Sequence, residues 1–145
     1  LRDAGVPPST LVLEFTEGLL LKADEAVQSR LARLRDEGVQ LALDDFGTGY
    51  SSLTYLQQFP VDILKIDQSF VRIEPADGKR RALCGAIVAT GHSLGLKVVA
   101  EGIETEEQHD RLAALGCDFG QGYLYGKPVG LGEFLGALDA EAARP

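Results

Sequence analysis

Short apolar segments alternate regularly with longer amphipathic ones, and this alternation constrains the fold of the chain most. The short segments predict β-strands, and several are dense in Val, Leu and Ile, as in parallel strands covered on both faces. They are Leu11–Phe15, Val39–Leu43, Asp62–Ile66, Lys97–Ala100 and Asp118–Phe119. Helical segments separate them, so we expect a parallel α/β fold, either a doubly wound sheet or a (β/α) barrel.

The predicted helices follow from apolar residues at helical spacing. They cover Asp24–Glu37, Lys79–Leu94 and Leu131–Ala143, and another begins at a capping box formed by Thr105 and Gln108. In the Lys79–Leu94 helix we expect the buried face to carry Leu83, Ala86, Ile87, Thr90 and Leu94. Gly38, Gly95 and Gly116 each end a helical pattern and precede an apolar segment, which predicts left-handed glycines there.

Length and composition narrow the classes further. A complete barrel needs about 200 residues or more, and this chain has 145 and no Met. We therefore expect a piece of a longer protein, folded as an incomplete barrel that lacks its first strands. The net charge of −8 disfavours DNA or RNA binding.

The chain shows neither a membrane-spanning apolar run nor a secretory signal. Its two cysteines, Cys84 and Cys117, lack zinc-ligand spacing. Reduced thiols and a cytoplasmic location are the expectation.

Charged and amide side chains gather at the ends of the predicted strands. Carboxyl ends of parallel strands share one rim, where active sites form. The residues are Glu14, Asp44, Asp45, Lys65, Asp67, Glu101 and Gln121. Carboxylates are hard oxygen ligands, so this rim suits Mg²⁺ or Mn²⁺.

Two of these positions have competing interpretations. Successive strand residues point to opposite faces, so Asp44 and Asp45 reach one site only if the backbone bends, which the glycines after them permit. Otherwise Asp45 caps a turn and Asp44 is solvated. Lys65 interrupts an apolar strand, so it either enters a charged site or extends to solvent from an edge strand.

The remaining polar residues are assigned supporting roles. Glu17 and Glu104 each lie three residues after a strand-end Glu and either support a loop or lie on the surface. Asp67 is expected to bond to the turn after its strand. We interpret His92 and His109 as structural or surface residues. No Ser–His–Asp arrangement or phosphate-binding P-loop is visible.

Five motifs in order resemble those of the EAL domain family of cyclic di-GMP phosphodiesterases. They are the segments 13–17 (Leu-Glu-Phe-Thr-Glu), 44–53 (Asp-Asp-Phe-Gly-Thr-Gly-Tyr-Ser-Ser-Leu), 64–67 (Leu-Lys-Ile-Asp), 99–105 (Val-Ala-Glu-Gly-Ile-Glu-Thr) and 120–123 (Gly-Gln-Gly-Tyr), followed by Lys127-Pro128. The resemblance implies a TIM-like barrel. Residues 1–145 would then be the C-terminal portion of a single EAL domain.

The resemblance also implies roles for residues. Glu14 and Asp44 would bind metal directly, and Asp45 would bind or bridge two Mg²⁺ or Mn²⁺ ions. Lys65 would hold the attacking water, Glu101 would act as base or orient that water, and Gln121 would hydrogen-bond near it. Glu17 would brace the loop 44–53, which in this family also links the site to the dimer interface, while Glu104 would support the site from behind.

The implied activity is hydrolysis of cyclic di-GMP to linear pGpG in bacterial signal transduction, by a homodimer with upstream sensory or GGDEF-type domains. The Glu-Ala-Leu tripeptide and the metal-binding Asn of the family are absent. This fragment alone is therefore expected to form an incomplete site. The alternatives are a non-catalytic cyclic di-GMP receptor that signals through a protein partner, and a metal-independent scaffold.

Overall fold

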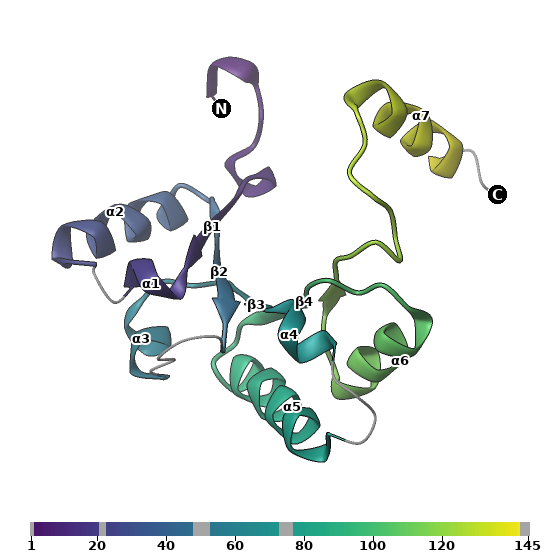
Figure 1. Cartoon of the computed structure of the whole chain (residues 1–145). Helices are drawn as coiled ribbons and strands as arrows, with labels where there is room; N and C mark the ends of the chain where they lie inside the picture. The colour runs from purple at the N-terminus through teal and green to yellow at the C-terminus, as the bar shows by residue number, and fades with distance from the viewer. Residues whose placement is uncertain (1, 21–22, 48–52, 73–76, 143–145) are drawn as a thin grey trace.

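Five parallel strands form one sheet in the order in which they occur along the chain (Figure 1). The computed structural model describes residues 2–20, 23–47, 53–72 and 77–142. The strands are β1 (Val12–Thr16), β2 (Gln40–Phe46), β3 (Ile63–Ile66), β4 (Lys97–Ala100) and β5 (Phe119–Gly120). A doubly wound sheet reverses its strand order at a switch point, whereas this order never reverses. The sheet is therefore part of a TIM-like barrel.

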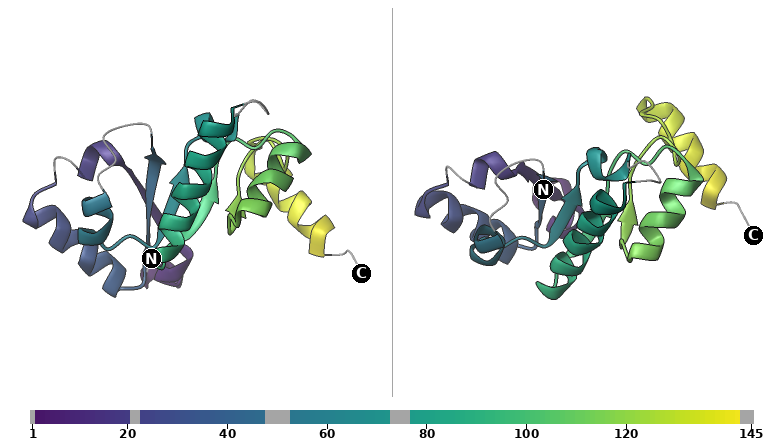
Figure 2. Two further views of the ribbon diagram at one scale, coloured as in Figure 1. Left: turned by 90° about the horizontal axis from the view of Figure 1, so that it is seen from below. Right: turned by 60° about the horizontal axis from the view of Figure 1, so that its bottom comes forward.

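Helices lie along the outer side of this curved sheet, as the two views of Figure 2 also show. The longer ones on this side are α2 (Glu25–Asp36), α5 (Gly78–Ser93) and α6 (Glu106–Leu115), and a fourth long helix, α7 (Leu131–Ala142), lies away from the sheet. These match the four predicted helices, and the last predicted residue, Ala143, lies outside the described part. The short elements α1 (Glu17–Leu20), α3 (Leu53–Gln58), α4 (Gln68–Val71), η1 (Arg2–Ala4) and η2 (Pro8–Thr10) were not predicted.

Helix ends follow the predicted signals. Thr105 and Gln108 form the reciprocal capping box at the start of α6. Gly38, Gly95 and Gly116 have φ values of 97°, 75° and 91°. Each therefore adopts the left-handed conformation that turns the chain from a helix toward the next strand.

The core lies between the sheet and the helices outside it. It includes Leu41, Leu43, Leu64, Ile66 and Val98, which point outward from β2, β3 and β4 and are fully buried. On α5 the buried residues are Cys84, Ile87, Val88 and Gly91, so the predicted burial of Ile87 is confirmed, whereas that of Leu83 and Ala86, which are exposed, is wrong. Because α5 is apolar nearly all round, its sequence does not single out one face.

The inner face of the sheet is polar at one end and open elsewhere. Parallel register places Glu14, Lys65 and Val99 on this side. Phe119 of β5 shares it and is 58% exposed. The segment with α7 extends away from the sheet in Figure 1, and its Leu131, Phe134, Leu135 and Leu138 are exposed.

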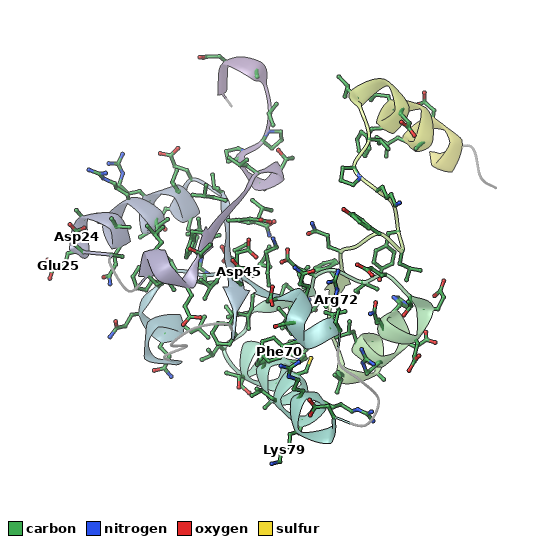
Figure 3. The ribbon with its side chains drawn as sticks, viewed as in Figure 1. Asp24, Glu25, Asp45, Phe70, Arg72 and Lys79 are labelled. Carbon is green, nitrogen blue, oxygen red and sulfur yellow. The ribbon has the colours of Figure 1, made fainter. Side chains whose placement is uncertain are left out.

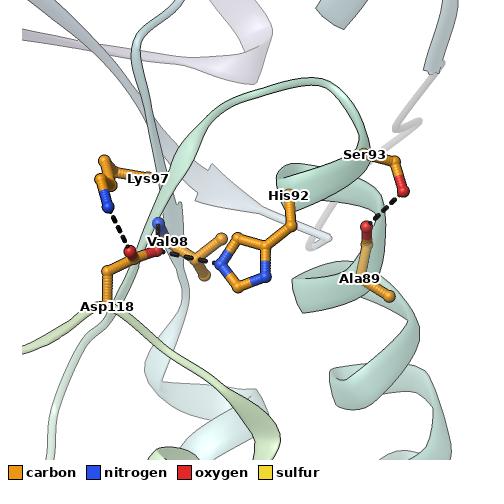
Figure 4. A network of polar contacts seen from close by, with 6 residues as sticks. All are labelled: Ala89, His92, Ser93, Lys97, Val98 and Asp118. Carbon is orange, nitrogen blue, oxygen red and sulfur yellow. Dashed lines mark hydrogen bonds and ion pairs between the residues drawn. The ribbon is translucent and has the colours of Figure 1, made fainter.

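An aspartate before a strand ties neighbouring strands together at the opposite rim. Asp118 accepts hydrogen bonds from Lys97 Nζ (2.7 Å) and Val98 N (2.9 Å), and its carboxylate lies 3.0 Å from His92 Nε2 (Figure 4). These hydrogen bonds, that of Lys97 first, hold the pKa of Asp118 well below its usual range. Asp62 plays the same part before β3, with Leu41 N and Arg35 as donors. The structural role predicted for His92 is thus confirmed.

Candidate active site at the strand carboxyl ends

Lys65 is the centre of the polar rim. Its side chain is buried, and its Nζ lies 2.7 Å from Glu14 Oε2, 2.5 Å from Glu101 Oε1 and 3.4 Å from Asp44 Oδ1. β3 lies between β2 and β4, so the edge-strand interpretation is wrong. Burial lowers the pKa of Lys65, but hydrogen bonds to Glu101 and Glu14 outweigh it and raise that pKa overall. The ammonium is therefore charged at neutral pH.

Asp44 and Asp45 are brought to one side by an irregularity in β2. The pairing register with β3 shifts between Leu43 and Phe46, and Asp45 has a φ of 57°. Asp44 Oδ1 accepts a hydrogen bond from Asp45 N at 2.9 Å. The predicted bend is confirmed, although the strand continues through both aspartates to Phe46. Because Asp44 also faces Lys65, it is more than a solvated surface residue.

Three carboxylates in the described part of the chain could share a cation. Oxygen atoms of Asp44, Asp45 and Glu101 lie within 4.8 Å of one another, and all three residues are half-buried. Such a donor set fits Mg²⁺ or Mn²⁺. Glu14 is not in this group and reaches it through Lys65. Burial raises the pKa of Glu101, and the hydrogen bond from Lys65 opposes that effect.

A cleft of about 330 Å³ adjoins this cluster. Its lining includes Asp45, Asp67, Glu101, Glu104 and Gln121. The structure thus brings five of the predicted site residues to one hollow. The cleft is wide enough for part of a nucleotide-sized ligand.

The supporting residues are placed as follows. Asp67 accepts a hydrogen bond from Ser69 N at 2.9 Å, which confirms its predicted bond to the turn after β3. Glu104 Oε1 accepts a hydrogen bond from Arg72 at 2.6 Å. Glu17 is buried. Residues 48–52 of the loop that it is predicted to brace lie outside the described residues, so that role stays a prediction.

Sequence reasoning missed three side chains in the cleft, Gln68, Arg72 and Tyr123. Arg72 directly follows α4, a four-residue helix with no periodic signal. Tyr123 belongs to the segment 120–123 and lies under the ammonium of Lys127, which is 5.7 Å from its ring centroid. In Figure 3, Asp45 and Arg72 lie near the middle of the molecule, whereas Asp24, Glu25 and Lys79 lie at its periphery.

Backbone contacts join the two loops that carry Glu101 and Gln121. Ile103 N donates to Gln121 O at 3.1 Å, and Leu124 N donates to Ile103 O at 3.0 Å. A Cβ at Gly122 would overlap the backbone of Ile103. His109 lies 2.8 Å from the hydroxyl of Tyr125 and helps to anchor the same segment.

A buried ammonium in contact with three carboxylates, beside an acidic trio that could hold a divalent cation, makes the carboxyl ends of these parallel strands the candidate active site. The EAL domain family model matches residues 1–128, and the chain belongs to this family. Over 148 aligned residues it is 45% identical to the cyclic di-GMP phosphodiesterase NbdA of Pseudomonas aeruginosa, covering 100% of this chain and 19% of NbdA.

Solved structures agree. The PaMucR phosphodiesterase in complex with c-di-GMP superimposes with a TM-score of 0.85 and 43% identity, covering 92% of this chain and 54% of that one. Klebsiella pneumoniae BlrP1, in its manganese and cyclic di-GMP complex, gives a TM-score of 0.81 and 37% identity. The match covers 88% of this chain and 33% of the BlrP1 chain.

The chain spans only 17–19% of the length of the first curated relatives. Within the described residues no helix is both long and apolar enough to cross a membrane.

Proposed function

We propose that the protein carrying this chain hydrolyses cyclic di-GMP to linear pGpG in a reaction that depends on divalent cations. The Lys65 ammonium, in contact with Glu14, Asp44 and Glu101, is the observation that carries this proposal. The relatives support the substrate, because NbdA and RocR of Pseudomonas aeruginosa are both named cyclic di-GMP phosphodiesterases. Residues 1–145 would be the C-terminal portion of one EAL domain.

Asp44 and Asp45 would hold two Mg²⁺ or Mn²⁺ ions; Glu101 belongs to the same cluster, and Glu14, which contacts Lys65 beside it, would be a further ligand. Bound cations of this kind lower the pKa of water and offset phosphoryl charge. The manganese and calcium complexes of BlrP1 with cyclic di-GMP support a divalent requirement in the family.

This chain's own residues would orient the attack. Lys65 donates a hydrogen bond to the attacking water, Glu101 accepts the water proton, and Gln121 fixes the water from the next loop. The water oxygen forms a bond to phosphorus while the bond from phosphorus to one ribose oxygen breaks, and this oxygen takes the electron pair and a proton from solvent, which opens the ring. Charge that develops on the phosphoryl oxygens then faces the preorganised Lys65 ammonium.

The cleft beside the cluster would receive one nucleoside half of the ligand. Arg72 offers donors suited to a guanine edge or a phosphate, and the Tyr123 ring offers a stacking surface. We further propose a homodimer with upstream sensory or GGDEF-type domains. The name of MucR as a bifunctional diguanylate cyclase/phosphodiesterase supports the latter.

The first experiment measures cyclic di-GMP hydrolysis by the whole protein with Mg²⁺ or Mn²⁺, with Asp44→Ala as control. We expect pGpG from the wild type, and no turnover from a folded Asp44→Ala variant or after chelation. Tight binding of cyclic di-GMP without turnover by the wild type would instead indicate a receptor. A wild type that neither binds nor hydrolyses cyclic di-GMP would contradict the proposal.

A further inference from the structure

Helix α4 packs beside the end of β2, which carries Asp44 and Asp45, and beside the loop after β4 that begins with Glu101. It follows β3 at Asp67, whose side chain caps its first turn through Ser69 N. At its other end Val71 O accepts a hydrogen bond from Arg111 of α6 at 2.5 Å. The short helix is therefore held at both ends by specific polar contacts.

Phe70 of α4 packs against the backbone that follows Asp45. A Cβ built on Gly47 would lie 2.7 Å from Phe70 Cε2 and 2.8 Å from Cζ, so the ring occupies the space beside this glycine. Phe70 is 8% exposed, and Gly47 has a φ of 96°. Only glycine combines this conformation with so close an approach. Figure 3 shows Phe70 on the side of α4 near the end of β2.

The backbone beside this contact is unusual. Asp45 has a positive φ and lies within the stretch, between Leu43 and Phe46, where the register of β2 against β3 shifts. A left-handed aspartate persists where surrounding contacts determine it. Phe46, buried at 5% exposure, fixes the outer side of this bend. The Phe70 ring against Gly47 fixes the next step of the chain.

The same helix touches the loop of the third carboxylate. A Cβ on Gly102 would lie 2.7 Å from Gln68 Cβ, and Gly102 directly follows Glu101. α4 thus contacts the backbone just after the aspartate pair and just after Glu101. It therefore packs against both segments whose carboxylate oxygens lie within 4.8 Å of one another.

We propose that Phe70 is a positioning residue of the metal site, which acts by holding the left-handed bend that aims Asp44 and Asp45 at one cation. This inference rests on the metal-dependent function proposed above. Phe70 lies behind the ligands and need not touch cation or substrate. A residue that served only the core would affect stability and leave metal affinity unchanged.

The test compares Phe70→Leu with Phe59→Leu in the whole protein. Phe59 is 5% exposed and precedes β3 at the opposite rim, so its variant is a matched loss of aromatic packing. Mn²⁺ binding is followed by the electron paramagnetic resonance signal of the free ion, and Tm is measured with chelator. We expect the Kd of Mn²⁺ to rise on the order of tenfold in Phe70→Leu and to stay within about twofold in Phe59→Leu.

A second variant keeps the test independent of how Phe70→Leu folds. Gly47→Ala should weaken Mn²⁺ binding on its own, because its methyl group would clash with the Phe70 ring. The pair Gly47→Ala/Phe70→Leu should lose less than the product of the single effects, because the smaller Leu leaves room for that methyl group. If Phe70→Leu, Gly47→Ala and Phe59→Leu all bound Mn²⁺ as tightly as one another, the positioning role of Phe70 would be wrong, and the proposed metal-dependent function would stand. A wild type that binds no Mn²⁺ would overturn the metal-dependent function as well.

Discussion

The Lys65 ammonium lies 2.5 Å from the Glu101 carboxylate, and the two residues come from adjacent parallel strands or their ends. The same ammonium contacts Glu14 and Asp44. The positive charge of Lys65 therefore offsets the repulsion among the three carboxylates around it. Its removal should affect both catalysis and the stability of the metal-free protein.

Lys65→Met retains the length of the side chain without its charge. We expect turnover to fall by on the order of 10² to 10³, because the donor to the attacking water and the preorganised charge that faces the phosphoryl oxygens are both lost. We also expect the metal-free protein to lose about 1–3 kcal/mol of unfolding free energy, with part of it restored by Mn²⁺. Steady-state kinetics and urea unfolding measure the two effects.

Lys97→Met is the matched control, because Lys97 is exposed at the opposite rim and pairs with Asp118. It should keep its turnover. Near-normal hydrolysis by Lys65→Met would remove Lys65 from the mechanism.

Glu101→Gln should change how the stability of the metal-free protein depends on pH. Burial raises the pKa of Glu101 in the folded protein. Its contribution to stability is therefore complete below the unfolded pKa and is lost as pH rises through the folded pKa. We expect the wild type to lose more unfolding free energy than Glu101→Gln between about pH 4 and pH 8, measured by urea unfolding with chelator.

Glu107→Gln on the exposed side of α6 serves as control and should follow the wild type. Parallel pH curves for wild type and Glu101→Gln would show that ionisation of Glu101 is not linked to folding.

Asp118→Asn tests the opposite rim of the sheet, where the pH dependence of stability should run in the opposite direction to that of Glu101. Hydrogen bonds from Lys97 and Val98 N lower the pKa of Asp118, so its contribution is present above the unfolded pKa and lost as pH falls through the folded one. We expect Asp118→Asn to cost about 1–2 kcal/mol at pH 7 and progressively less below about pH 4. Thermal unfolding at several pH values checks this, and a cost that does not depend on pH would contradict it.

The sequence predicts the parts of this structure that depend on periodic or local signals. The five strands, the four longer helices, the α6 capping box and the left-handed glycines at 38, 95 and 116 follow from such signals. The gathering of carboxylates around Lys65 follows from the rule that parallel strands share one rim.

Other features depend on tertiary contacts that leave no local pattern. The buried face of α5 was predicted only in part because its apolar residues surround the helix. α4 is too short for periodicity to show, so Arg72 and Phe70 were not assigned to the site. The grouping of Glu101, rather than Glu14, with the aspartate pair depends on the bend at Asp45.

The Gln121 loop offers the sharpest comparison between neighbouring glycines. Gly122 has no room for a Cβ, because the backbone of Ile103 fills that space, whereas nothing lies within 4 Å of a Cβ on Gly126. Gly122→Ala must push apart the loops that carry Glu101 and Gln121, and backbone can give way only by moving these residues. We therefore expect Gly122→Ala to lose most turnover and about 1–3 kcal/mol of stability.

Gly126→Ala should match the wild type in both, since neither its backbone conformation nor its surroundings oppose a methyl group. Hydrolysis rates and Tm of the two variants, measured side by side, decide the matter. If both variants were equally active, the hydrogen bonds between Ile103, Gln121 and Leu124 would not be what holds Gln121 at the site.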